Sequence, residues 1–217
     1  MFVRYWMTPK PVTVAEDTSL CDTWELMVEK DLRRLIVVRG KEVCGIISQS
    51  DLYRLTDPTS IAMRTADAAA TLCSEFKTKT AGDLMTPSPL LCAMGDPLED
   101  VGAKMKDNRI AALPVVKGHS ELVGIITETD IFRALMQITS AGAKGRRLSF
   151  QVRPEDKQQL YQDVFALCET HGVEILTLLS HPMEGKDHFA LLRVDGGDVE
   201  TLVEALWDNK YRVLEVS

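Results

Sequence analysis

The sequence predicts an α+β protein made of a duplicated unit followed by a third unit of different design. Residues 45–51 read GIISQSD and residues 124–130 read GIITETD, so one seven-residue pattern occurs twice in the same register. Self-similarity of this kind indicates a repeated supersecondary unit. After the second copy comes a small and basic stretch, AGAKGRR at 141–147, which is typical of a linker. The tail beyond it has its own pattern of strands and helices.

The first copy is predicted to run from strand to helix to a two-stranded hairpin and a closing helix. A β-branched stretch at 12–14 precedes a helix whose apolar residues recur at three- and four-residue spacing, with Asp17 near its start. The apolar face of this helix consists of Leu20, Trp24, Met27 and Val28. Strands at 35–38 and 43–47 are joined by a turn at 39–42, and a helix begins at Asp51. Upstream, Met7-Thr8-Pro9 corresponds to Met85-Thr86-Pro87, so the repeat extends beyond the seven-residue pattern.

The remaining elements divide the chain into five parts. A connection rich in Thr, Ala and Asp, with a helical segment at 66–76, leads into a second copy that spans about 84–138. The pattern of the tail predicts strands at 148–152, 173–179, 188–194 and 211–216, and helices at 157–171 and 198–209. This is the strand, helix, strand, strand, helix, strand order of ferredoxin-like folds. We therefore predict repeat units at 1–60 and 83–139, connecting segments at 61–82 and 140–147, and a separate domain at 148–217.

Composition excludes several classes of protein. A hydrophobic content of 45% with 26% charged residues is that of an ordinary globular chain, and a net charge of −7 argues against a nucleic acid or an anionic membrane as the main partner. No apolar run is long enough to span a bilayer, and the first residues lack a secretory signal pattern, so a cytoplasmic location is expected. Five scattered cysteines without metal-ligand spacing predict reduced, mostly buried thiols.

The sequence offers no catalytic motif. The four histidines lie in predicted turns or at element ends, and none is placed beside a cysteine or carboxylate in a recognisable nucleophile or metal arrangement. A phosphate-binding GxxxxGK[ST] loop and a GxGxxG turn are both absent. We therefore expect a protein without enzyme activity of its own.

Both copies resemble the cystathionine-beta-synthase (CBS) domain, whose second strand and following helix carry a glycine, hydroxyl residues and an aspartate in this order. The resemblance implies a tandem pair with pseudo-two-fold symmetry that holds adenosyl ligands in clefts between the copies. The tail resembles an ACT domain, a small ligand-binding or dimerisation module. The whole order, two CBS copies and an ACT-like tail, resembles the AcuB-type acetoin-utilisation family.

The resemblance also implies two sets of ligand-binding residues, each combining the acidic end of one copy with the opening segment of the other. One cleft would use Thr8, Thr13, Leu32, Thr127, Thr129 and Asp130. The other would use Thr86, Leu91, Ile110, Ser48, Ser50 and Asp51. The aspartates would accept the ribose hydroxyls, the hydroxyl side chains would bond phosphate or ribose, and the apolar residues would enclose the adenine ring.

The alternative is that the two aspartates only cap their helices, which is worth about 1 kcal/mol each.

The two copies also differ in sequence at positions close to these motifs. Arg33 corresponds to Ala111, which makes the Asp51 cleft the better candidate for a charged adenylate, although a solvated arginine at a helix end is an equal reading. Ile36 stands where the family usually has proline, whereas the second copy keeps Pro114. We do not expect this departure to abolish the cleft.

The tail has a departure of its own. Amino-acid-binding ACT domains have a glycine in the turn after the first strand, and here that turn, 153–156, reads RPED. Dimerisation or signal relay is therefore favoured over amino-acid sensing.

These observations favour a regulatory protein that binds AMP, ADP, ATP or a related adenosyl compound and relays its state through a homodimer to a regulated protein that is unknown. The rival interpretation is a scaffold with empty clefts. Catalysis of acetoin breakdown would rest on the family name alone.

Overall fold

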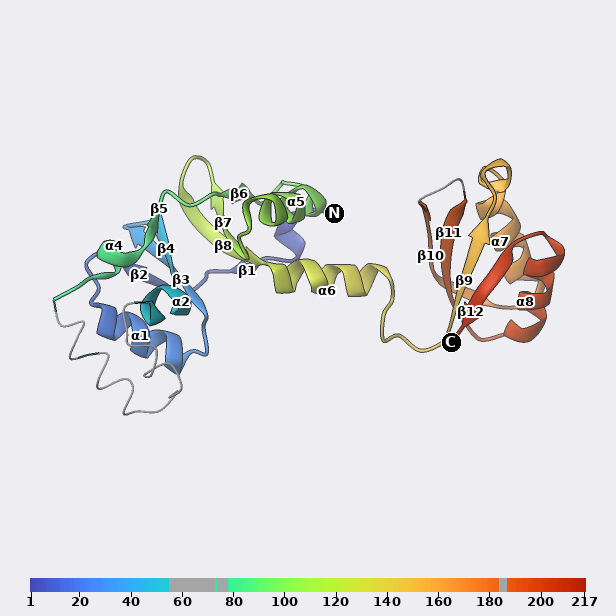
Figure 1. Cartoon of the computed structure of the whole chain (residues 1–217), viewed down its shortest axis with the longest axis horizontal. Coiled ribbons are helices and arrows are strands. Elements are labelled where there is room, and N and C mark those ends of the chain that lie inside the picture. Colours follow the sequence, from blue (N-terminus) through green and yellow to red (C-terminus); the bar gives the residue numbers. More distant parts are fainter. Residues whose placement is uncertain (55–72, 74–77, 184–186) are drawn as a thin grey trace. The chain divides into compact units, whose positions relative to one another are not determined.

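The computed structural model describes residues 1–54, 73, 78–183 and 187–217, and it divides into two compact units, 1–131 and 132–217 (Figure 1). The first unit holds the repeat up to residue 131, and the second holds the rest of the last helix of the repeat and the tail. Apart from Cys73, the helix predicted at 66–76 lies outside the described residues. Within the described part of the chain, no helix combines the length and the apolar character that crossing a bilayer requires.

The first copy has the predicted order of elements. Its elements are β2 (Thr13–Ala15), α1 (Leu20–Glu29), β3 (Arg34–Arg39), β4 (Glu42–Ser48) and α2 (Gln49–Tyr53). α1 buries Leu20, Trp24 and Met27, while Val28, predicted on the same face, is 56% exposed. The residue that caps α1 is Ser19, whose Oγ accepts a hydrogen bond from the Asp22 amide at 3.0 Å, and not Asp17.

The second copy repeats this plan. Its elements are β6 (Cys92–Ala93), α5 (Leu98–Asn108), β7 (Ala112–Lys117), β8 (Glu121–Thr127) and α6 (Glu128–Ile138). In both copies the first strand runs parallel to the second, and the second and third form an antiparallel hairpin. The sheet order β2-β3-β4-β8-β7-β6 is palindromic, with β4 and β8 in contact at Glu42 and Glu121. The two copies are therefore related by a pseudo-two-fold axis between β4 and β8.

Each copy receives a short segment that precedes the other copy. The segment 1–9, with η1 (Val3–Tyr5) and β1 (Thr8–Pro9), pairs with β8 of the second copy. The segment 79–87, with α4 (Ala81–Leu84) and β5 (Thr86–Pro87), pairs with β4 of the first copy. Equivalent backbone hydrogen bonds anchor the two leading segments, from the Leu98 amide to the Met1 carbonyl and from the Leu20 amide to the Lys79 carbonyl. The exchange interlocks the copies into one unit.

The glycines of the repeated pattern are explained by this exchange. A Cβ placed on Gly45 would overlap the side chain of Met85, and one placed on Gly124 would lie 2.7 Å from Met7 Sδ. Both methionines belong to the leading segments. The glycines thus make room for the exchanged methionine and do not provide a turn with positive φ.

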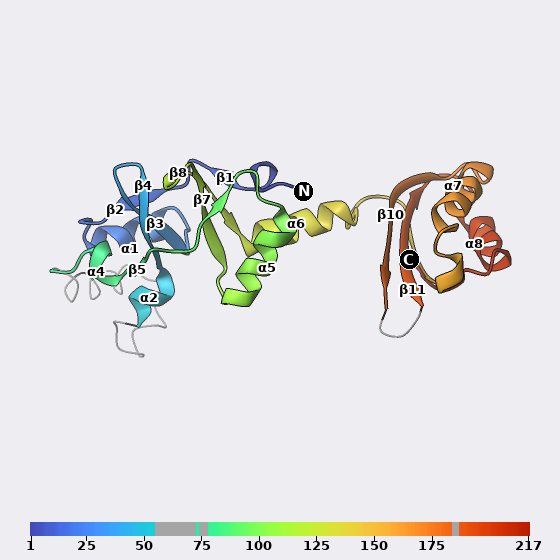
Figure 2. The same ribbon diagram turned by 90° about the horizontal axis from the view of Figure 1, so that it is seen from above.

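The second unit has the predicted ferredoxin-like order. Its elements are β9 (Arg146–Val152), η3 (Pro154–Asp156), α7 (Leu160–Thr170), β10 (Glu174–Pro182), β11 (His188–Asp195), α8 (Val199–Asp208) and β12 (Arg212–Val216). The strands form an antiparallel sheet in the order β10-β11-β9-β12, and both helices cover one face of it (Figure 2). β9 begins two residues earlier than predicted, because Arg146 and Arg147 pair with β11.

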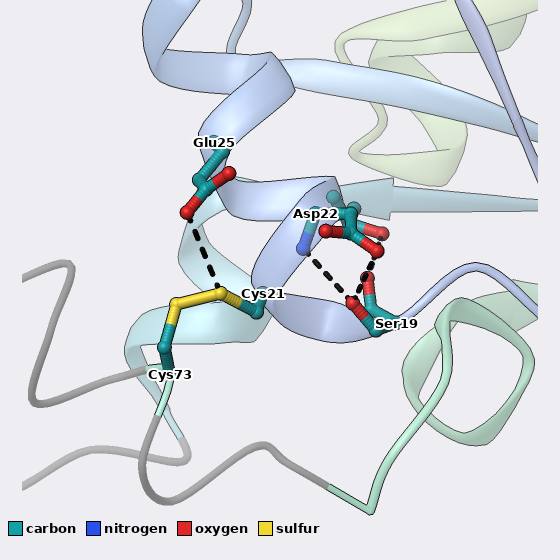
Figure 3. The surroundings of a disulfide bond; sticks show 6 residues. Ser19, Cys21, Asp22, Glu25 and Cys73 are labelled. Atoms are coloured by element: carbon teal, nitrogen blue, oxygen red, sulfur yellow. Dashed lines mark hydrogen bonds between the residues drawn. A yellow bond between two sulfur atoms is a disulfide. The ribbon is translucent and has the colours of Figure 1, made fainter.

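The cysteines differ from the prediction of reduced thiols. Cys21, in the first turn of α1, forms a disulfide with Cys73, 52 residues further along the chain (Figure 3). The disulfide occupies both sulfurs beside Glu25, so these three residues do not offer a free metal-ligand set. Among the other cysteines, burial raises the pKa of Cys92 to about 12 and that of Cys168 to about 11, which keeps these thiols protonated.

Candidate functional site

The Asp51 motif lies where β4 ends and α2 begins. Asp51 Oδ2 accepts hydrogen bonds from the Ser48 amide at 2.9 Å and from Ser48 Oγ at 2.5 Å, and Ser48 Oγ accepts one from the Asp51 amide at 3.3 Å. This is a complete capping box. Asp51 Oδ1 lies 3.7 Å from a guanidinium nitrogen of Arg54, and the Asp51 side chain is 22% exposed.

The Asp130 motif repeats this geometry where β8 meets α6. Asp130 Oδ2 accepts hydrogen bonds from the Thr127 amide at 2.9 Å and from Thr127 Oγ1 at 2.7 Å. Asp130 is only 3% exposed. The capping role considered for both aspartates is therefore confirmed. A cap does not exclude a ligand, because an ionised carboxylate has about four acceptor positions, but the Asp51 carboxylate is the more accessible of the two.

The exchanged leading segments bring a further hydroxyl to each motif. Thr86 pairs with Ile46, two residues before Ser48, and Thr8 pairs with Ile125, two residues before Thr127. Both threonines are exposed. Each motif thus combines the end of one copy with a hydroxyl that precedes the other copy, as the family resemblance implies. The remaining hydroxyl candidates, Ser50 and Thr129, lie in the first turns of α2 and α6 and are exposed.

The other candidates are Thr13 and the apolar residues predicted to enclose the adenine ring, Leu32, Leu91 and Ile110. Their described contacts lie within their own copies. The Gln49 side chain donates a hydrogen bond to the Leu32 carbonyl at 3.0 Å, and Thr13 pairs with Ile36 in the parallel strands β2 and β3. In the second copy, the Leu91 carbonyl accepts a hydrogen bond from Lys104 Nζ, and the Ile110 amide bonds to the Met105 carbonyl. The assignment of these four residues to one cleft or the other stays a prediction.

Ile36, the departure from the family pattern, is accommodated within the sheet. It is fully buried in β3 and pairs with Ile46 of β4, as Pro114 of β7 pairs with Ile125 of β8. The replacement thus leaves the strand in register.

The residues that flank the two motifs differ in charge at two equivalent positions. The Gln49 amide donates to the Arg33 carbonyl at 3.0 Å, and the Glu128 amide donates to the Ala111 carbonyl at 3.2 Å, so the two pairs occupy equivalent places. Arg33 is exposed beside a neutral glutamine, whereas the second copy has an alanine beside an exposed glutamate. At these two equivalent positions, the first copy therefore carries one positive side chain and the second copy one negative side chain. Comparing the two copies in the sequence identified the difference between Arg33 and Ala111. The equivalent difference between Gln49 and Glu128 was missed, although the two residues occupy the same position of the repeated seven-residue pattern.

A cavity of about 540 Å³ lies elsewhere in the first copy, beyond the far ends of β2 and β3. It is lined by Ala15, Glu16, Asp17, Val38, Arg39, Gly40 and Thr80. The Arg39 guanidinium pairs with Glu16 at 2.6 Å, which leaves Asp17 as the remaining charged residue of the lining. It contains none of the residues predicted to bind a nucleotide.

Comparison with known proteins identifies similar chains over the repeat. CBSX2, a chloroplastic CBS domain-containing protein of Arabidopsis thaliana, is 32% identical over 149 residues, which cover 61% of this chain and 63% of that protein. The match therefore spans less than two thirds of this curated relative. A crystal structure of CBSX2 in complex with AMP is 34% identical and has a TM-score of 0.52, covering 63% of this chain and 97% of that one.

A second solved structure carries the name that the resemblance suggested. A putative acetoin utilization protein (AcuB) from Vibrio cholerae is 27% identical with a TM-score of 0.52, covering 64% of this chain and 93% of that one. The CBS domain family model matches residues 3–56 and 81–137, which together are more than half of the chain. These ranges contain both aspartate motifs and most of both leading segments. The chain belongs to the CBS domain family.

Proposed function

We propose that this protein is a non-catalytic regulator whose CBS pair binds an adenine nucleotide, primarily beside Asp51. The observation that carries the proposal is the accessible Asp51 carboxylate at the start of α2. The strand that ends at this motif pairs with the exchanged Thr86, and the Gln49 amide of the motif bonds to the carbonyl of the exposed Arg33. The AMP complex of CBSX2, which is 34% identical over the CBS pair, supports a nucleotide of this class. AMP is the first candidate, and ADP, ATP and related adenosyl compounds share the groups that would be recognised.

The chemistry of the motif fits a ribose phosphate. The Asp51 carboxylate can accept hydrogen bonds from two adjacent ribose hydroxyls while it keeps its cap. The Ser48 hydroxyl donates its proton to Asp51 within the cap. The hydroxyls of Ser50 and Thr86 and the guanidinium of Arg33 can donate to phosphate oxygens, and charge-assisted hydrogen bonds of this type are the stronger ones. The Asp130 motif would bind a less charged adenosyl compound, because the exposed Glu128 lies two residues before Asp130.

Regulation requires that the ligand bind two arrangements of the protein with different affinity. The exchanged leading segments couple the two copies, so a ligand that contacts both Asp51 and Thr86 would act on both. The second unit, which we propose to be an ACT-like domain, would relay the change within a homodimer to a regulated protein. A cytoplasmic location belongs to the same proposal.

Isothermal titration of AMP into the full chain and into Asp51→Ala tests the ligand site. Loss of hydrogen bonds to a charged group is expected to weaken binding by about 1.5–3 kcal/mol, which is roughly 10- to 150-fold. The matched control is Asp83→Ala. Asp83 forms an equivalent capping box with Thr80, at 2.8 Å to its amide, without being a predicted ligand residue.

Asp83→Ala should lower stability by about 1 kcal/mol, as a lost cap does, and leave AMP affinity unchanged. Equal affinity in Asp51→Ala and the wild type would remove Asp51 from the site. The absence of binding of AMP, ADP and ATP at millimolar concentration would instead support the scaffold interpretation, in which both aspartates only cap their helices.

A further inference from the structure

The open face of the C-terminal sheet carries a cationic cluster that the nucleotide site does not use. α7 and α8 cover the face formed by Leu148, Phe150 and their neighbours (Figure 2). Because side chains alternate along a strand, Arg147 and Ser149 of β9 lie on the opposite face. Arg193 of β11 is the direct cross-strand partner of Arg147, so it shares that face.

The two arginines are arranged in a way that normally costs stability. Like charges directly opposite on neighbouring strands repel each other. Within the described part of the chain, neither guanidinium has a carboxylate within ion-pair distance, and both Nε atoms are buried without a hydrogen-bond partner. Arg193 makes one hydrogen bond, from Nη1 to the Ala143 carbonyl at 3.0 Å. By contrast, Arg146, on the helix-covered side, pairs with Glu200 at 3.2 Å.

Ser149 adds a third unsatisfied donor to this cluster. It is 3% exposed, and its Oγ has no hydrogen-bond partner among the described residues. A buried hydroxyl without a partner is costly, which makes such a group a marker of a missing ligand or water. Ser149 is two residues from Arg147 on the same strand and diagonal to Arg193. Three donors thus meet in one small area.

The surroundings define the borders of this area. On the β10 side, Thr177 pairs with Arg193, and its hydroxyl is held by the Ile138 carbonyl and the Ser140 hydroxyl. Residues 138–143, which connect α6 to β9, therefore close one border. On the β12 side, Glu215 is the cross-strand partner of Ser149, and no ion pair between it and either arginine is found in the described chain. The centre of the area is positive in a chain with a net charge of −7.

We propose that Arg147, Arg193 and Ser149 form a binding site for a small oxyanion, either a carboxylate or a phosphate. Guanidinium groups match both anions through paired N–H donors, and an anion between two arginines removes their repulsion. Arg193 also donates a hydrogen bond to the Ala143 carbonyl, so the ligand would act directly on the segment that joins α6 to β9. The site is separate from the Asp51 motif and does not depend on nucleotide binding.

The test follows the Nε–Hε signals of the arginines by ¹H–¹⁵N NMR on the full chain. Inorganic phosphate and malonate are added in separate titrations, with sodium chloride at matched ionic strength as the reference. Saturable shifts of the Arg147 and Arg193 signals, assigned with Arg147→Lys and Arg193→Lys, are expected for at least one anion. A response to phosphate alone or to malonate alone identifies the ligand class.

Matched variants make the result specific. Arg147→Lys and Arg193→Lys should each weaken anion binding at least fivefold, and Arg146→Lys, whose arginine lies on the other side of the same strand, should not change it. AMP affinity should remain that of the wild type in all three. Shifts that equal those in sodium chloride would overturn the proposal. So would shifts that follow protein concentration and not the anion, because a second copy would then occupy this face.

Discussion

The two CBS copies share one backbone plan but surround their aspartates differently. Asp51 is partly exposed, with Arg33 and Gln49 at the flanking positions, whereas Asp130 is buried, with Ala111 and Glu128 at the equivalent positions. The capping boxes themselves agree to within about 0.2 Å in their Oδ2 distances. Because both aspartates have the same capping geometry, the aspartate itself reveals little about ligand preference. The neighbouring side chains, which folding leaves free to vary, distinguish the copies.

The disulfide is the largest difference between the copies. It joins the first turn of α1 to Cys73, while the equivalent position in α5 is the exposed Glu99. Cys21→Ser is expected to lower the free energy of unfolding of the first unit by about 2–4 kcal/mol, because the cross-link restricts the unfolded chain. Denaturant unfolding followed by the fluorescence of the buried Trp24 measures this loss.

The control for the disulfide is Glu99→Ser, which should change stability by less than about 0.5 kcal/mol, as surface substitutions do. Dithiothreitol should destabilise the wild type as much as Cys21→Ser does and leave that variant unaffected. Five reactive thiols in the denatured, unreduced protein would show that the disulfide is absent.

The motif glycines provide a second comparison. Gly45→Ala and Gly124→Ala are each expected to cost about 1–3 kcal/mol through overpacking against the exchanged methionines. Gly45→Ala should cost more, because its new Cβ would overlap the Met85 side chain as far back as Cβ, whereas at Gly124 the nearest atom is the flexible end of Met7. Thermal unfolding measures both. Gly95→Ala, with nothing within 4 Å of the added Cβ, is the control, and an equal loss there would contradict the packing explanation.

The charged residues that flank the two aspartate motifs provide a third comparison between the copies. Arg33→Ala is expected to reduce AMP affinity about tenfold, the scale of one hydrogen bond to a charged group, without changing the affinity for adenosine. In the second copy, Ala111→Arg combined with Glu128→Gln should increase the affinity for AMP there. Titration calorimetry with both ligands separates the cases. An equal loss of AMP and adenosine binding in Arg33→Ala would exclude a phosphate contact.

Local pattern was enough to predict much of the fold. The spacing of Leu20, Trp24 and Met27 predicted α1, and the turn at 39–42 predicted the β3–β4 hairpin, because these features depend on neighbours in sequence. The motif repeat also located both capping aspartates. The partner of Cys21 could not be predicted, since no local signal links residues 52 apart. The burial of Asp130 and the unpaired Arg147 depend on tertiary packing, which the pattern of one strand or helix does not contain.

The smallest expected effect concerns a buried thiol of the second copy. Burial raises the pKa of Cys92 from 9.0 to about 12. For an acid whose pKa is higher in the folded state, the stabilisation is complete below the unfolded pKa and is lost as the pH rises through the interval between the two values. Between pH 7 and 9.5 this loss amounts to about 0.8 kcal/mol.

Cys92→Ala should remove that part of the pH dependence of unfolding, because the unfolded chain then has no thiol to ionise at this position. The half-buried Cys44 of the first copy, whose pKa burial also raises, provides the comparison through Cys44→Ala. An unchanged slope in Cys92→Ala would mean that the thiol ionises as readily in the folded protein as in the unfolded one, and that β6 admits solvent.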